Sequence, residues 1–183
     1  VAEEVQAQVD HFEAIGGAGM VIDIASGDVL AAVSLPTFDP NHPGSPQDRS
    51  RFNRLSSGVY EMGSSFKIFS TAALLDKQDP DLNTVFKTTQ PIRRGRFTIT
   101  DYHPENHDMT IPEIFMHSSN IGAALMAEEV GTPDIKDFYE KLGFFGPLET
   151  DLMTTARPLV PKPWGPLSTL TASYGHGIAV TPL

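Results

Sequence analysis

The chain has 183 residues, enough for one compact domain with a hydrophobic core but few for two. Hydrophobic residues make up 40% of it and charged residues 20%, which is typical of a globular protein rather than a disordered one. Its 23 acidic and 13 basic residues give a formal net charge of -10, which argues against a nucleic-acid partner, and the absence of cysteine excludes disulfides and thiolate metal sites.

The first 35 residues predict a helix followed by a β-hairpin. Apolar residues recur at helical spacing from Val1 to about Ile15, and two glycines then end the pattern. From Gly19 to Leu35 two short apolar runs flank a turn at Ala25–Asp28, which is a hairpin signature. We therefore expect a helix packed on an antiparallel sheet.

Loops, short strands and several helices are predicted after the hairpin. Pro36–Ser57 is rich in proline and predicts a loop, whereas the segment from Ser64 has an apolar helical period and predicts a buried helix. Between about 84 and 110, Phe97–Thr100 is the best strand candidate, and the basic stretch Arg93–Arg96 is interpreted as a solvated turn. Further helices are predicted at Ile111–Met116, Ile121–Val130 and Asp134–Leu142, with a last one at Leu167–Ala179 broken around Gly175–Gly177.

Ser64 and Lys67 form the first candidate for chemistry. A serine hydroxyl needs a nearby base to act as a nucleophile, and a lysine three residues later on a helix lies on the same face. A helix start favours negative charge on Ser64, and its dipole together with apolar neighbours favours the neutral form of Lys67. This spacing arises often by chance, so the pair needs support from elsewhere in the chain.

That support comes from Ser118–Asn120, which stands between two predicted helices. A hydroxyl and a carboxamide two residues apart can point into one cleft there. The same letters also suit a helix cap, so this motif is informative only together with the first one.

Both motifs, in this order, resemble those of class B penicillin-binding proteins. Gly58–Lys67 resembles their active-serine segment, His117–Gly122 their S-x-N segment, and Tyr174–Leu183 the helix that follows. Val21–Pro36 resembles the first hairpin of their transpeptidase domains. Arg157–Gly165 looks closest to the septal, cell-division branch of Gram-negative bacteria.

The resemblance implies an α+β fold of the penicillin-binding protein/serine β-lactamase type, with an antiparallel sheet packed by helices and a helical subdomain. Residues 1–183 would form part of such a transpeptidase domain, with the first helix and hairpin at 1–35 and the active-serine helix and helical subdomain at about 58–183. The Lys-Thr-Gly strand of this family does not occur after Ser118. We expect that strand and the rest of the sheet to lie beyond Leu183.

The resemblance also implies a role for four residues. Ser64 would attack the carbonyl between two D-alanines of a peptidoglycan stem peptide, and Lys67 would take its proton. Ser118 would relay a proton to the leaving amine, and Asn120 would hold Lys67 and bind the substrate amide. The backbone N–H of Ser64 would form half of an oxyanion hole.

The expected partners are stem peptides ending in D-Ala-D-Ala, β-lactam antibiotics and, in the full-length protein, cell-division proteins. No cofactor and no metal ion is expected. No apolar run reaches the roughly 18 residues of a transmembrane helix, and Val1–Glu4 lacks the basic start of a signal peptide. The family places the protein at the periplasmic face of the bacterial inner membrane, so we expect its anchor outside this chain.

Three alternatives remain open from the residues. A serine β-lactamase shares the serine and lysine but must also activate a water, and no residue here identifies that base. A non-catalytic β-lactam sensor or scaffold would be acylated once without turnover. Asp101–Asp108 gathers histidines and carboxylates that can bind zinc, but Pro104 prevents a helix there and an exposed acidic loop explains the same residues. His176 between glycines is better explained by tight backbone packing than by catalysis.

Overall fold

The computed structural model describes residues 1–45, 48–148, 150 and 155–183. The chain divides into two compact units, which are described separately. The first contains Val1–Tyr60, Pro147–Arg157 and Val180–Leu183, and the second contains Glu61–Gly146 and Pro158–Ala179. Within the described residues, no helix is long and apolar enough to cross a membrane.

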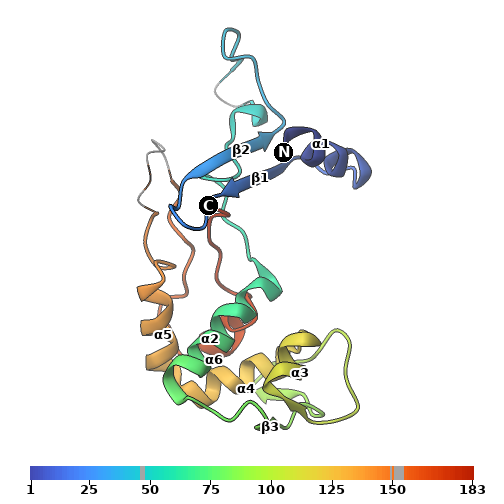
Figure 1. Cartoon of the computed structure of the whole chain (residues 1–183), viewed down its shortest axis with the longest axis vertical. Coiled ribbons are helices and arrows are strands. Elements are labelled where there is room, and N and C mark those ends of the chain that lie inside the picture. The colour runs from blue at the N-terminus through green and yellow to red at the C-terminus, as the bar shows by residue number, and fades with distance from the viewer. Residues whose placement is uncertain (46–47, 149, 151–154) are drawn as a thin grey trace. The chain divides into compact units, whose positions relative to one another are not determined.

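The first unit is built on a helix and a hairpin, as predicted. Helix α1 (Ala2–His11) is followed by β1 (Gly17–Ile22) and β2 (Val29–Leu35), which pair antiparallel from Gly17 opposite Leu35 (Figure 1). The turn between the strands is held by Asp23, whose Oδ1 accepts the N–H groups of Ala25 and Ser26 at 2.8 and 2.9 Å.

Helix α1 is shorter than the sequence predicted, because the chain reverses before Ile15. Glu13 has a φ of 50°, and Ala14 N–H bonds the Val9 carbonyl while Glu13 N–H bonds that of Asp10. This pattern is a Schellman motif, which satisfies the last carbonyls of a helix and ends it. Ile15, counted in the apolar face of the predicted helix, is 82% exposed.

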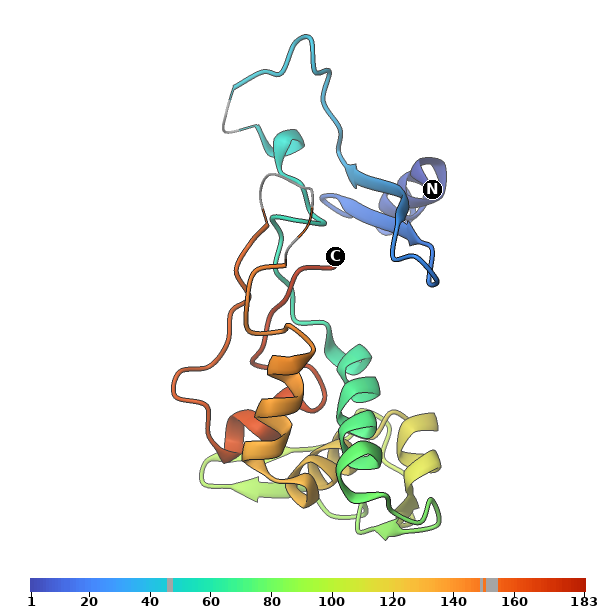
Figure 2. The same cartoon turned by 60° about the vertical axis from the view of Figure 1, so that its left-hand side comes forward.

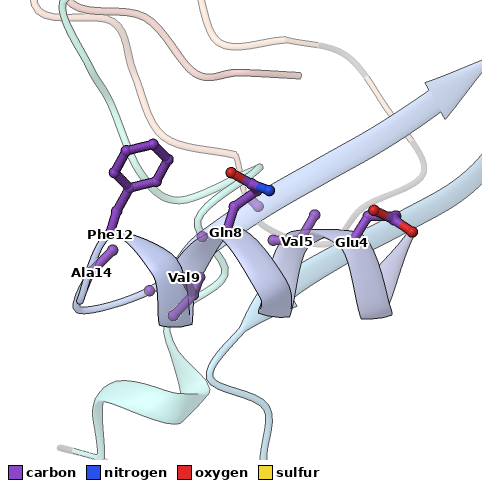
Figure 3. A pocket seen from close by; sticks show the side chains of 9 residues that line it. Glu4, Val5, Gln8, Val9, Phe12 and Ala14 are labelled. Carbon is purple, nitrogen blue, oxygen red and sulfur yellow. The ribbon is translucent and has the colours of Figure 1, made fainter.

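Two glycines of β1 allow α1 to approach the strand closely. A Cβ at Gly17 would lie 2.8 Å from Val9 Cγ2, and a Cβ at Gly19 would lie 2.8 Å from Val5 Cγ2. Figure 3 shows Val5, Val9 and Phe12 around an open pocket between α1 and the start of β1. Even so, no residue of α1 is buried.

The second unit is mainly helical. Its helices are α2 (Lys67–Gln78), α3 (Ile111–Met116), α4 (Asn120–Val130), α5 (Thr132–Lys141) and α6 (Pro166–Ala172). Two small antiparallel pairs join β3 (Val85–Phe86) to β6 (Met109–Thr110) and β4 (Ile92–Arg94) to β5 (Phe97–Ile99). The predicted short strands and middle helices are thus confirmed within a few residues.

Helix α4 is the centre of this unit and contacts α2, α5 and α6 (Figure 1, Figure 2). It is apolar on most of its surface, which is the pattern of a helix packed on all sides. Its buried residues are Ile121, Gly122, Ala123, Ala124, Met126, Ala127 and Val130. The small side chains among them allow the neighbouring helices to come close.

The basic stretch Arg93–Arg96 forms the tight turn between β4 and β5, with Gly95 at a φ of 59°. The sequence pattern predicted a solvated turn here, and the turn is confirmed. Arg94 is not purely solvated, however, since it pairs with Glu128 of α4.

Candidate active site

Ser64 lies in a short 3₁₀ turn, η2 (Gly63–Phe66), that leads directly into α2. Side chains three residues apart eclipse in a 3₁₀ turn, so this geometry brings Ser64 and Lys67 together more closely than an α-helix would. Ser64 itself is exposed. The predicted helix start at Ser64 is therefore confirmed in position, with a tighter first turn than expected.

A cluster of aromatic side chains, Phe66, Tyr139 and Phe144, packs against this turn. Phe66, between the serine and the lysine, is 1% exposed. Its ring centroid lies 4.9 Å from that of Phe144 and 5.8 Å from that of Tyr139, which belongs to α5. Such packing fixes the backbone of the turn, so Ser64 is held in place by the core of the helical unit.

Lys67 is buried, and its ammonium group is directed at two serines. The residue is 3% exposed. Its Nζ lies 3.1 Å from Ser64 Oγ and 2.9 Å from Ser118 Oγ. Nζ also donates to the backbone carbonyl of Ser118. These three acceptors match the three N–H donors of a protonated lysine.

Burial lowers the pKa of Lys67 from 10.5 to about 8, while the negative charge of Asp101 acts in the opposite direction. Burial disfavours the charged ammonium because the protein interior solvates it less well than water. Near pH 7 most of Lys67 is therefore still protonated, but the neutral fraction is far larger than for a lysine with a pKa of 10.5. In the neutral form Nζ has a free lone pair and can accept the Ser64 proton.

Ser118 occupies a strained position at the end of α3. Its φ is 55°, in the left-handed region, which few residues other than glycine adopt. Ser118 N–H bonds the Phe115 carbonyl at 3.2 Å, and Ser119 N–H bonds the Ile114 carbonyl at 3.0 Å. This conformation directs both the hydroxyl and the carbonyl of Ser118 at Lys67.

The next two residues begin α4. Ser119 is buried and caps the helix, since its Oγ accepts the Gly122 N–H at 2.8 Å. Asn120 is half-buried, and its Nδ2 donates to the Thr100 carbonyl at 3.1 Å. The family resemblance implied that Asn120 would hold Lys67. In the part of the chain that the structure describes, the hydrogen bonds of Lys67 go to Ser64 and Ser118 instead.

Asp101 is a site residue that the sequence did not identify as such. It was counted in an exposed acidic segment, yet its Oδ2 accepts from Ser119 Oγ at 2.7 Å and its Oδ1 from Ile121 N–H at 2.9 Å. These contacts join positions 18 and 20 residues apart, and no motif in the sequence signals them.

A second clamp joins the serine turn to the segment around His176. Gly63 N–H bonds the Gly175 carbonyl at 3.3 Å, and a Cβ at Gly175 would lie 2.1 Å from the Gly63 oxygen. Glu61 binds His176 Nδ1 at 2.9 Å and the Gly177 N–H at 2.7 Å. The tight backbone packing expected beside His176 is present.

The histidines and carboxylates of Asp101–Asp108 pair with other side chains. Glu105 lies 3.1 Å from His117 Nδ1, and His107 lies 3.7 Å from Glu113. Among the described residues, no three groups of the types that ligate metals are arranged to hold an ion. The geometry of the site is that of a serine nucleophile beside a buried lysine, with a second serine opposite.

This arrangement coincides with a match to the family model for the penicillin binding protein transpeptidase domain, which covers residues 17–183. The chain belongs to this family. The fold class expected from the sequence is confirmed by it and by the solved structures that the chain resembles.

The similar proteins are cell-wall enzymes by name. The chain is 36% identical over 181 residues to the "Probable peptidoglycan D,D-transpeptidase FtsI" of Caulobacter vibrioides, covering 99% of this chain and 31% of that protein. It superposes with a TM-score of 0.83 and 29% identity on the transpeptidase domain of Burkholderia pseudomallei penicillin-binding protein 3, covering 98% of this chain and 50% of that one.

A third similar protein has a different name. A crystal structure of "a peptidoglycan glycosyltransferase" from Burkholderia ambifaria matches with a TM-score of 0.85 and 28% identity, covering 98% of this chain and 54% of that one. The chain thus spans about a third of the curated relative's length and about half of each structural relative's length.

Proposed function

We propose that this protein is a peptidoglycan D,D-transpeptidase in which Ser64 becomes acylated. The observation that carries the proposal is the exposed Ser64 hydroxyl, 3.1 Å from a buried Lys67 whose pKa is lowered to about 8. A nucleophile within hydrogen-bond reach of a group that can be neutral at the working pH is the minimum machinery for acyl transfer.

In the first step, Ser64 Oγ attacks the carbonyl carbon of the bond between two D-alanines, and its proton passes to neutral Lys67 Nζ. The C–N bond then breaks, and the leaving amine takes a proton through the Ser118 hydroxyl, which lies 2.9 Å from Nζ. The terminal D-alanine leaves and an ester on Ser64 remains. The Ser64 N–H, at the start of a helical turn, is suited to stabilise the oxyanion.

In the second step, the amine of a neighbouring stem peptide attacks this ester. As the new amide bond forms, the attacking amine gives up a proton to neutral Lys67, the bond to Ser64 Oγ breaks, and Lys67 passes that proton to Ser64 Oγ. The product is a cross-link between two stem peptides. A β-lactam is attacked in the same way, but its opened ring stays attached, so the acyl-enzyme persists. Asn120, the first residue of α4 and two residues after Ser118, would bind the substrate amide.

Glycosyl transfer is less consistent with this site, although one similar structure is named for it. Enzymes that cleave glycosidic bonds use a pair of carboxylates on either side of the bond. Here the groups around Ser64 are a lysine and a second serine, and the Asp101 carboxylate is occupied by Ser119 and Ile121.

The relatives support a proposal about the biological setting. We infer that the protein cross-links peptidoglycan during cell division, because a relative is named FtsI and the family model is that of a transpeptidase. Cell-division proteins are then the expected partners, and the periplasmic face of the inner membrane is the expected location. The Lys-Thr-Gly strand and the membrane anchor stay predictions.

The decisive experiment is intact-mass analysis of the full-length protein after incubation with a labelled penicillin. We expect one adduct on the native protein and none on Ser64→Ala. Ser65→Ala is the matched control, because Ser65 is also an exposed serine of η2, and it should retain the adduct.

An undiminished adduct in Ser64→Ala, or no adduct on the native protein, would refute the proposal. The same preparation separates the alternatives. Rapid release of hydrolysed penicillin would indicate a β-lactamase. Acylation without turnover of a D-Ala-D-Ala thioester mimic would indicate a sensor or scaffold.

A further inference from the structure

The Asp101 carboxylate is bonded at both of its oxygens to the start of α4. Oδ2 accepts from the Ser119 hydroxyl at 2.7 Å, and Oδ1 accepts from the Ile121 N–H at 2.9 Å. Ser119 Oγ in turn accepts the Gly122 N–H at 2.8 Å. One carboxylate thereby organises the first turn of α4, where free N–H groups and the helix dipole favour a negative charge.

This anchor is adjacent to the strained residue of the site. Ser118 has a φ of 55°, and a non-glycine residue keeps such a conformation only where its surroundings hold it. On its N-terminal side, α3 provides the Phe115 carbonyl for Ser118 N–H. On its C-terminal side, Ser119 is fixed through the bond of its hydroxyl to Asp101.

We infer that Asp101 is a positioning residue for acyl transfer: it holds the Ser118–Ser119 turn so that the Ser118 hydroxyl and carbonyl both face Lys67. The inference rests on the acyl transfer proposed for Ser64. Without the anchor, the turn can relax toward ordinary backbone angles. The Ser118 hydroxyl then moves away from the proton path.

The charge of Asp101 also acts on Lys67. It raises the pKa of Lys67 and so opposes the lowering by burial, which is the larger effect. The described residues contain no ion pair between the two groups within 4.0 Å, so the carboxylate acts at a distance while its oxygens bind Ser119 and Ile121.

Three carboxylates on the helices around α2 are bound elsewhere. Glu113 of α3 caps its own helix through Thr110, Glu128 of α4 pairs with Arg94, and Asp137 of α5 pairs with Lys77 and Lys141. On the Asp101 segment, Tyr102 is 89% exposed, and its ring packs edge-on to the exposed His103. Among the charged side chains that the structure describes, Asp101 is the one that shifts the pKa of Lys67.

Two substitutions separate position from charge. Asp101→Asn keeps the shape and removes the charge, whereas Asp101→Ala removes both bonds. Asp108→Asn is the matched control, because Asp108 lies on the same segment and binds Thr89 at 3.0 Å rather than α4. The readouts are the acylation rate of the full-length protein by labelled penicillin across pH, and the pKa of Lys67 from an NMR titration.

We expect Asp101→Ala to slow acylation by about tenfold or more, since small misplacements of reacting groups have such effects. Asp101→Asn should slow it less and move the midpoint of the pH–rate profile to lower pH. Asp108→Asn should change neither. If Asp101→Ala does not fold, Ser119→Ala decides the question, because it removes the hydroxyl that bonds Asp101 Oδ2 and leaves the carboxylate in place.

A native acylation rate in Asp101→Ala, or in Ser119→Ala if Asp101→Ala does not fold, would overturn the inference, as would equal effects of Asp108→Asn. Failure of the proposed function gives a different result, namely no adduct on the unsubstituted protein. The NMR titration still reports the influence of Asp101 in that case. A lower Lys67 pKa in Asp101→Asn supports the charge effect of Asp101, and an unchanged one contradicts that effect.

Discussion

The two units of the protein treat their apolar residues differently. In the helical unit, α4 buries seven residues and Ile135 of α5 is 0% exposed. In the hairpin unit, α1 buries none, and Ile24 at the hairpin turn is 100% exposed. Apolar residues that the sequence places at helical or strand spacing therefore contribute differently to stability in the two units. The candidate active site lies in the unit that has its own core, which keeps Ser64, Lys67 and Ser118 in a fixed arrangement.

The largest loss of stability should come from removing a core side chain of the helical unit. Ile135→Ala deletes a fully buried side chain, and such deletions lower the free energy of unfolding by about 2–5 kcal/mol because a cavity remains. Urea denaturation followed by circular dichroism measures the loss. A loss well under about 1 kcal/mol would show that α5 is not part of a tightly packed core.

The pH dependence of acylation sharpens the same comparison, because burial in the helical unit lowers the pKa of Lys67 to about 8. Protonated lysine cannot accept the Ser64 proton. The acylation rate should therefore rise about tenfold per pH unit below about pH 8 and level off above it. Labelled-penicillin kinetics on the full-length protein measure this profile. A midpoint near the ordinary lysine pKa of 10.5 would contradict the burial of Lys67.

The smallest change in the free energy of unfolding is expected for a substitution in the hairpin unit. Ile24→Ala makes the same chemical change as Ile135→Ala at a position that is 100% exposed. Surface substitutions of this kind change the free energy of unfolding by about 0.5 kcal/mol or less. The same urea titration provides the measurement. A loss comparable to that of Ile135→Ala would mean that Ile24 is covered in solution, and the contrast between the units would disappear.

Local sequence patterns predicted most of the elements but not their burial. Two apolar runs on either side of a turn identified the hairpin, and the prolines, glycines and asparagine that bound the middle segments identified α3, α4 and α5. The end of α1 was wrong by about a turn, since Glu13 adopts a left-handed conformation that no propensity favours. The last predicted helix is confirmed only as α6 (Pro166–Ala172).

The sequence alone determined that the two groups proposed to react can meet: Ser64 and Lys67 are three residues apart, and a serine and lysine at that spacing lie together wherever the chain is helical. Only the tertiary structure decided what surrounds them. The burial that lowers the Lys67 pKa, the approach of Ser118 from 51 residues away and the anchoring of Ser119 by Asp101 depend on contacts between distant segments. Local periodicity cannot specify such contacts, because they arise when separate helices pack into one core.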